Sequence, residues 1–130
     1  MPYIFEDDIL IVSHSIAIVD NENDTVELFK DILTNNGYNV AGFTNPLLAF
    51  QYIKKNQEEF NLILCDYKMI PFNGCDLARK IAAEVNTTIT IIIITAANGI
   101  GINPLNLQVY FKPLKMSKLI DIVKKNIPSV

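Results

Sequence analysis

Four polar residues stand where short apolar runs of the chain end, and their types suit phosphoryl chemistry. They are Asp20, Asp66, Thr95 and Lys112. A carboxylate beside a magnesium ion can attack a phosphoryl group, because the metal offsets the charge repulsion between the two. A lysine and a hydroxyl can hold the transferring oxygens. The two acids therefore suggest a shared divalent cation with oxygen ligands, and Lys112 and Thr95 fit the other two roles.

A parallel sheet would bring these four residues to one edge. Apolar runs bounded by polar residues predict strands at 16–19, 38–43, 61–65, 88–95 and 107–111. Capping residues and apolar stripes predict helices at 24–36, 45–56, 75–84 and 116–126. The first is expected to start with a capping box of Asp24 and Glu27, and the second to open at Asn45-Pro46. This alternation predicts an α/β fold with a doubly wound five-stranded parallel sheet of order 2-1-3-4-5, as in flavodoxin. In that order Asp20 and Asp66 face each other across the crevice at the strands' carboxyl ends.

Two parts of the chain depart from the regular repeat. Between Ala96 and Asn106 there are two glycines and Pro104, each of which opposes a helix interior by roughly 1 to 3 kcal/mol. We expect a shortened or irregular fourth crossover there, with at most one or two helical turns. Residues 1–14 are expected to form an N-terminal extension to a domain at 15–130, and Ile9–Val12 could form a strand by itself.

Composition excludes several classes of protein. Of the 130 residues, 50% are hydrophobic and 19% are charged, which excludes a disordered chain. A net charge of −3 opposes a broad phosphate-binding surface, so direct binding to nucleic acid is not expected. The apolar stretch Ile9–Val19 is too short and too interrupted to span a membrane, and acids precede it where a signal peptide would be basic. Cys65 and Cys75 lack zinc-site spacing, which favours free thiols and a cytoplasmic location.

Short motifs at the ends of the predicted strands match the spacing of one known family. They are Val19-Asp20-Asn21-Glu22, Asp66 with Met69 and Gly74, Thr95-Ala96, and Lys112-Pro113. Each motif alone is weak, but together they are specific. Over residues 16 to about 127 the chain resembles the receiver domain of two-component response regulators, whose strand order is the predicted one.

The resemblance implies a role for each site residue. Asp66 would be the phospho-acceptor, and Asp20 would belong to the acidic pair that holds Mg²⁺. The backbone carbonyl of Lys68 would be a further magnesium ligand. Thr95 would bind the phosphoryl group and Lys112 would pair with it, and the Lys112-Pro113 bond is typically cis in that family.

The chain also departs from the family pattern. Asn21 stands where the family normally has a second carboxylate, so the expected metal set is Asp20, Asn21, Asp66 and the Lys68 carbonyl. The missing charge should weaken Mg²⁺ binding by about 1–3 kcal/mol. Val109 replaces an aromatic switch residue, and strand alternation should turn Tyr110 to the opposite face.

Three functions compete. The first is a stand-alone, non-enzymatic receiver, phosphorylated by a histidine kinase or phosphotransfer protein and signalling to a downstream protein partner by contact. The alternative is a pseudo-receiver, a protein-interaction module that signals without phosphorylation; Asn21, Val109 and the irregular crossover favour it. An aspartyl-nucleophile phosphatase is disfavoured, because Asp20 is followed by Asn21-Glu22 instead of the Asp-x-Asp pattern of such enzymes.

Overall fold

The protein is built on five parallel strands that form one sheet, seen in a computed structural model that describes residues 3–6, 9–12, 15–85, 88–96 and 105–127. The order of the strands is β4-β3-β5-β6-β7, which confirms the predicted order 2-1-3-4-5. The strands are β3 (Ser15–Val19), β4 (Asn39–Phe43), β5 (Phe60–Cys65), β6 (Thr90–Ala96) and β7 (Gln108–Lys112). The helices are α1 (Asn23–Asn35), α2 (Pro46–Lys55), α3 (Gly74–Glu84) and α4 (Met116–Asn126), with a short 3₁₀ turn, η1 (Gln57–Glu59).

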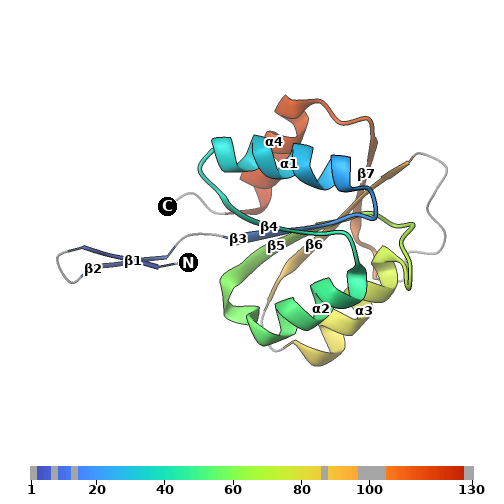
Figure 1. The fold of residues 1–130 in the computed structure, drawn as a ribbon, viewed down its shortest axis with the longest axis horizontal. Helices are drawn as coiled ribbons and strands as arrows, with labels where there is room; N and C mark the ends of the chain where they lie inside the picture. The colour runs from blue at the N-terminus through green and yellow to red at the C-terminus, as the bar shows by residue number, and fades with distance from the viewer. Residues whose placement is uncertain (1–2, 7–8, 13–14, 86–87, 97–104, 128–130) are drawn as a thin grey trace.

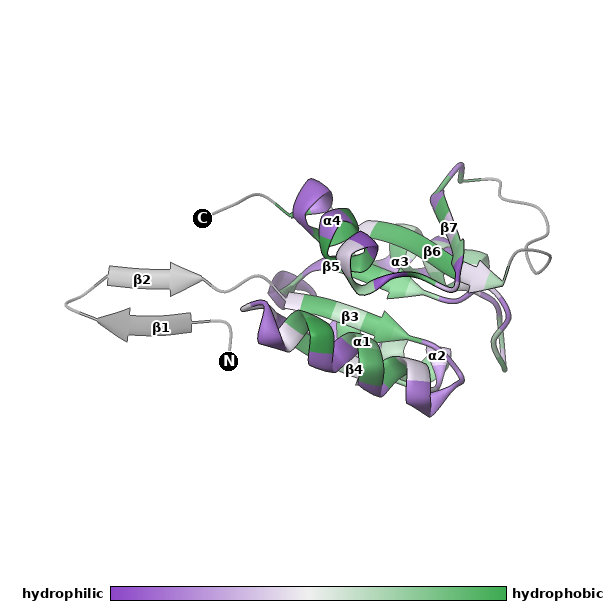
Figure 2. Ribbon diagram, turned by 90° about the horizontal axis from the view of Figure 1, so that it is seen from above, coloured by the Kyte–Doolittle hydropathy of each residue, from purple (hydrophilic) through white to green (hydrophobic). Residues whose placement is uncertain are grey.

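Helices cover the sheet on both faces, so its central strands are buried on both sides. Helices α1 and α4 lie on one face, and α2 and α3 lie on the other (Figure 1). In β3, Ile16 and Ile18 pack toward α1 and α4, whereas Ala17 and Val19 pack toward α2 and α3. Figure 2 shows hydrophobic residues along these strands and alternating hydrophobic and hydrophilic residues along α1. The continuous apolar runs of the sequence follow from this double coverage.

The N-terminal caps of α1 and α2 can be compared with the caps predicted from the sequence. The side chain of Asn45 accepts hydrogen bonds from the backbone of Leu47 and Leu48, so the predicted cap of α2 is confirmed. The predicted cap of α1 at Asp24 is wrong. Because the Asp20 carboxylate accepts a bond from the backbone N–H of Glu22, the chain turns into the helix earlier, and Glu22 occupies the N-cap position.

Strand β7 settles which way two side chains face. Val109 packs against the core beneath α2 and α3, and Tyr110 packs against the core beneath α1 and α4, as strand alternation predicts. The Lys112–Pro113 bond that follows is cis, as the resemblance implies, and so is Ile70–Pro71. The predicted form of the crossover before β7 concerns residues 97–104, which lie outside the described residues.

The first residues of the chain form a separate antiparallel hairpin. Strands β1 (Tyr3–Glu6) and β2 (Ile9–Val12) pair from Tyr3↔Val12 to Glu6↔Ile9 and make a two-stranded sheet of their own. The expected strand at Ile9–Val12 is therefore present, but its partner was not predicted. The boundary between residues 14 and 15 stays a prediction.

Candidate functional site

Asp20 and Asp66 lie side by side at the carboxyl edge of the sheet because their strands are neighbours. Val19 of β3 is in register with Cys65 of β5, so each acid comes one residue after a paired position. The backbone ladder continues past both strands. Asp66 N–H donates to the Val19 carbonyl at 2.9 Å, and Asp20 N–H donates to the Phe43 carbonyl at 3.0 Å. The sheet itself therefore fixes the backbones from which the two carboxylates project.

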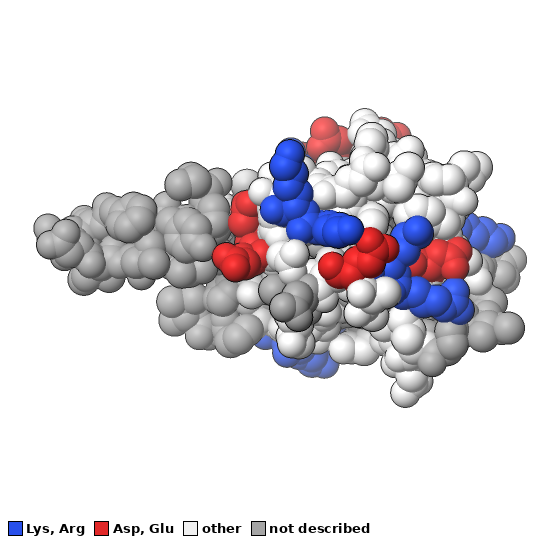
Figure 3. All heavy atoms as spheres, turned by 90° about the horizontal axis from the view of Figure 1, so that it is seen from below, with Lys and Arg blue, Asp and Glu red and all other residues white. Residues whose placement is uncertain are grey.

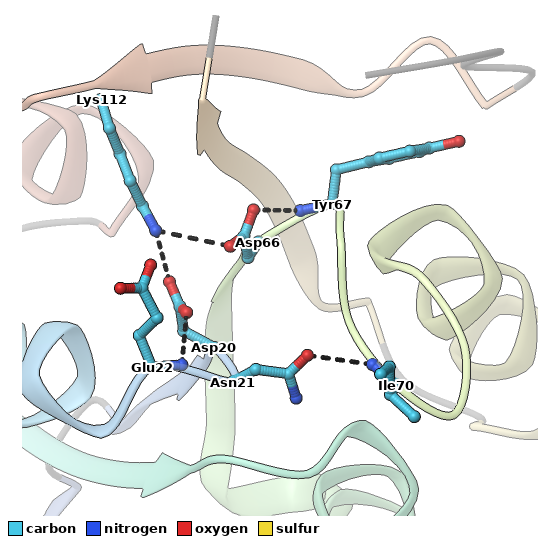
Figure 4. Close-up of polar contacts among 7 residues, drawn as sticks. All are labelled: Asp20, Asn21, Glu22, Asp66, Tyr67, Ile70 and Lys112. Atoms are coloured by element: carbon cyan, nitrogen blue, oxygen red, sulfur yellow. Dashed lines mark hydrogen bonds and ion pairs between the residues drawn. The ribbon is translucent and has the colours of Figure 1, made fainter. Parts of the chain in front are cut away.

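Lys112 bridges the two acids from the end of β7. Its Nζ lies 2.6 Å from Asp20 Oδ2 and 3.4 Å from Asp66 Oδ2 (Figure 4). The other carboxylate oxygens accept backbone hydrogen bonds, Asp20 Oδ1 from Glu22 at 2.9 Å and Asp66 Oδ1 from Tyr67 at 2.7 Å. Each of the four oxygens thus has a donor, and one ammonium group serves two carboxylates.

The charged groups of this cluster are poorly exposed to solvent, and this shifts the pKa values of Asp20 and Lys112. The side chain of Asp20 is only 5% exposed, against 12% for Asp66 and 21% for Lys112. Burial raises the pKa of Asp20, and the hydrogen bond from Lys112 offsets this only in part. Burial alone would lower the pKa of Lys112, but its hydrogen bond to Asp20 and the charges of both acids outweigh that effect and raise it. Asp20 is the least exposed of the three, so its carboxylate loses the most hydration. A further cation near Asp20 would therefore stabilise its ionised form.

Asn21 directly follows Asp20, and Lys68 comes two residues after Asp66, both outside the helices and strands. The Asn21 amide donates from Nδ2 to the Thr44 carbonyl at 2.8 Å, and its Oδ1 accepts from the backbone N–H of Ile70 at 3.0 Å. An amide oxygen has two lone pairs, so one is left for a cation. Lys68 is exposed on the loop after β5. Two carboxylates, an amide oxygen and a loop carbonyl are hard oxygen donors, which fit the chemistry of Mg²⁺.

Thr95 lies near the carboxyl end of β6, the strand between β5 and β7. It is buried on β6, in register with Phe111 of β7. Within the described part of the chain, the Asp66 carboxylate is bonded to Lys112 and Tyr67, and Thr95 is not among its partners. The structure therefore brings three of the four chemical residues into contact and places the fourth on a strand that pairs with β5 and β7.

Gly74 supports the site in a way that its sequence context does not show. It begins α3, and its N–H donates to the Tyr67 carbonyl at 2.9 Å, which closes the loop after Asp66. A Cβ added to Gly74 would collide with the backbone carbonyl oxygen of Asp66 and would lie 2.8 Å from Cδ1 of Ile93. Only glycine lets α3 approach the end of β5 this closely.

Gly74→Ala should lower the free energy of unfolding by about 1–3 kcal/mol, because the backbone oxygen of Asp66 cannot move aside as a flexible side chain could. Urea unfolding measures the change. Gly37→Ala is the control: Gly37 has φ +91° but no atom within 4 Å of an added Cβ, so only backbone strain of about 1 kcal/mol applies. Equal losses in the free energy of unfolding from the two changes would refute the close approach at Asp66.

The sequence matches one known protein family and several known proteins. The family profile described as response regulator receiver domain matches residues 16–124. The response regulator receiver protein CpdR of Brucella abortus is 28% identical over 115 residues, which cover 85% of this chain and 93% of CpdR. The transcriptional regulatory protein ZraR of Klebsiella oxytoca is 28% identical over 109 residues, but these are only 24% of ZraR.

Solved structures agree on the fold. A response regulator receiver domain protein from Clostridium thermocellum superposes with a TM-score of 0.76 at 18% identity. The match covers 88% of this chain and 94% of that protein. At this identity the likeness concerns the fold alone.

Proposed function

Because the chain belongs to the response regulator receiver domain family, we propose that it is a phospho-accepting receiver of a two-component, histidine-to-aspartate phosphorelay. One observation carries the proposal. Lys112 contacts both Asp20 and Asp66 at the ends of neighbouring parallel strands, which leaves Asp66 as an oriented carboxylate beside a cationic group. The proposed function is acceptance of one phosphoryl group per chain, and no turnover of a substrate is proposed.

The proposed transfer uses the groups in the contacts described above. An Asp66 carboxylate oxygen attacks the phosphorus of a phosphohistidine, a P–O bond forms, and the P–N bond breaks with its electron pair going to the imidazole nitrogen. The Lys112 ammonium, already 3.4 Å from Asp66, pairs with a phosphoryl oxygen. The Thr95 hydroxyl donates to another oxygen once the group is in place. Tyr67 N–H orients the carboxylate through its 2.7 Å bond.

Magnesium is the implied cofactor of this transfer. When bound, Mg²⁺ neutralises charge that develops between the carboxylates and the phosphoryl oxygens. The residues that would hold it are Asp20, Asp66, Asn21 through its amide oxygen, and Lys68 through its backbone carbonyl. In the described part of the chain there is no group of three acids, cysteines or histidines that could hold a metal, so the site has two acids.

Incubation with a small acyl phosphate, with and without Mg²⁺, tests the proposal by intact mass. We expect one added phosphoryl group per chain, formed faster with Mg²⁺ and lost on standing as an acyl phosphate hydrolyses. A protein that gains no phosphoryl group under either condition would be a pseudo-receiver, and the proposal would fail. Continuous release of phosphate from a phosphomonoester would instead indicate a phosphatase.

The proposed partners are proteins. A histidine kinase or phosphotransfer protein would supply the phosphoryl group, and a downstream protein would read the result by contact. The face formed by α2 and α3 shows Lys and Arg side chains next to Asp and Glu (Figure 3), with ion pairs Lys54–Glu84 and Arg79–Asp76. Mixed charge of this kind supports a protein partner over a nucleic acid.

A cytoplasmic location is part of the same proposal. None of the helices in the described ranges is long and apolar enough to cross a membrane. Cys65 and Cys75 are both buried free thiols, as reducing conditions allow.

Asn21→Asp should tighten Mg²⁺ binding by about 10- to 100-fold, because it adds a full charge beside Asp20 and Asp66. Calorimetric titration of both proteins measures the change. The matched control is Asn36→Asp, since Asn36 lies at the far end of α1 from the acids. Equal affinities would place Asn21 outside the metal shell or show that Glu22 already supplies the missing acid.

A further inference from the structure

The side chain of Asn21 joins two loops that are distant in sequence. Its Nδ2 donates to the Thr44 carbonyl in the loop before α2. Its Oδ1 accepts from Ile70 N–H in the loop before α3, as Figure 4 shows. We propose that Asn21 is a positioning residue that ties these loops together and so fixes the segment carrying the Lys68 carbonyl. Its consequence for phosphorylation rests on the proposed function, but the tie itself does not.

Both partners of Asn21 are backbone groups, and together they require an amide. Thr44 offers only a carbonyl oxygen, so its partner must be a donor, whereas Ile70 offers only an N–H, so its partner must be an acceptor. A rotated amide would put oxygen against oxygen and N–H against N–H. A carboxylate could accept from Ile70 but would face the Thr44 carbonyl without a proton to donate. The residue that weakens the metal shell is thus the one that can join the loops.

The second loop is held at several points, but among the described residues Ile70 has one hydrogen bond to a distant part of the chain, the bond to Asn21. The start of the loop is held by the bond from Tyr67 N–H to Asp66, its end by the reciprocal bonds of Asn73 and Asp76, and its two ends are joined by the bond from Gly74 N–H to the Tyr67 carbonyl. Met69 packs into the core beneath α2 and α3, whereas Ile70 is 79% exposed, so packing does not hold Ile70. The bond from Ile70 N–H to Asn21 therefore attaches the loop at a residue whose own side chain is not packed into the core.

Preorganisation of this loop would serve the metal site. A loop carbonyl that is already in place loses less freedom when a cation binds, so the tie offsets part of the charge lost at position 21. In Asn21→Asp, the added charge should strengthen Mg²⁺ binding, and loss of the bond to Thr44 should weaken it. Asn21→Ala should lose both hydrogen bonds and add no charge, so its Mg²⁺ binding should only weaken.

Amide exchange and ¹³C′ shifts, measured by NMR on metal-free protein without phosphodonor, test the tie directly. We expect Asn21→Ala to speed exchange at Ile70 by about 2- to 10-fold, the effect of one exposed hydrogen bond, while Ile63 in β5 stays unchanged. Asn21→Asp should keep Ile70 protected but shift the Thr44 ¹³C′ resonance. Asn36→Ala, which removes an amide that bonds only within the end of α1, should alter neither signal.

A second readout separates positioning from general stability. At saturating Mg²⁺, Asn21→Ala should be phosphorylated more slowly than the wild type, and its Ile70 exchange should be faster. Unchanged exchange at Ile70, or equal acceleration at Ile63, would overturn the tie. If the wild type accepts no phosphoryl group but Ile70 responds as expected in the variants, the tie stands and the proposed function fails.

Discussion

Asp66→Asn is expected to abolish the phosphoryl adduct completely. An amide is not a nucleophile toward phosphorus, yet it keeps the size of the carboxylate and can still accept the bond from Tyr67 N–H. Intact mass after treatment with an acyl phosphate and Mg²⁺ measures the result. Asp31→Asn, which makes the same change at an exposed position on α1, should leave the adduct intact.

Asp20 provides a sharper comparison, because it shares Lys112 with Asp66 but is not the proposed acceptor. Asp20→Asn should slow formation of the adduct without abolishing it. If the adduct persists on Asp66→Asn, or disappears only with Asp20→Asn, then Asp66 is not the phospho-acceptor.

Lys112→Met should lower the free energy of unfolding of the metal-free protein. It removes the cation that lies between two poorly exposed carboxylates and leaves them facing each other. Removing one partner of a fully buried pair costs about 3–5 kcal/mol, and partial exposure of this cluster reduces our expectation to about 1–3 kcal/mol. Urea unfolding of the metal-free protein at pH 7 measures it, and added Mg²⁺ should restore part of the loss.

The pH dependence of Lys112→Met follows from Asp20. Its pKa is already raised by burial, and loss of Lys112 raises it further. The folded state then binds a proton more readily than the unfolded state does, so stability should fall as pH rises from the ordinary carboxyl pKa of about 4. The variant should therefore lose more stability at pH 7 than at pH 5. Lys125→Met, an exposed change on α4, should show no such trend, and an equal loss at both pH values would contradict this account.

The fold was predictable because its signals are local. Each central strand is a continuous apolar run that ends at a polar residue, and parallel crossovers allow few topologies. Asp20 and Asp66 could be placed together for the same reason, since neighbouring parallel strands end at one edge. Lys112 could be placed near both acids because it ends β7. The sequence does not show that its Nζ lies closer to Asp20 than to Asp66.

The remaining features depend on partners far along the chain. Asn21 bonds to groups 23 and 49 residues away, so its context suggested a metal ligand and not a tie between loops. Gly74 is required by the approach of α3 to the Asp66 backbone, whereas the sequence shows it only as part of the motif that follows Asp66. The earlier start of α1 depends on the Asp20 side chain, which competes with the predicted cap at Asp24.

Identification of the modified residue tests the central claim most directly. Borohydride reduces an aspartyl phosphate to homoserine, so protein treated with an acyl phosphate and Mg²⁺, then reduced and digested, reports the acceptor by peptide mass. We predict homoserine at position 66 alone, and less of it when Mg²⁺ is omitted. Homoserine at another acid, or a phosphoryl group that survives the reduction, would contradict the assignment of Asp66 as the acceptor.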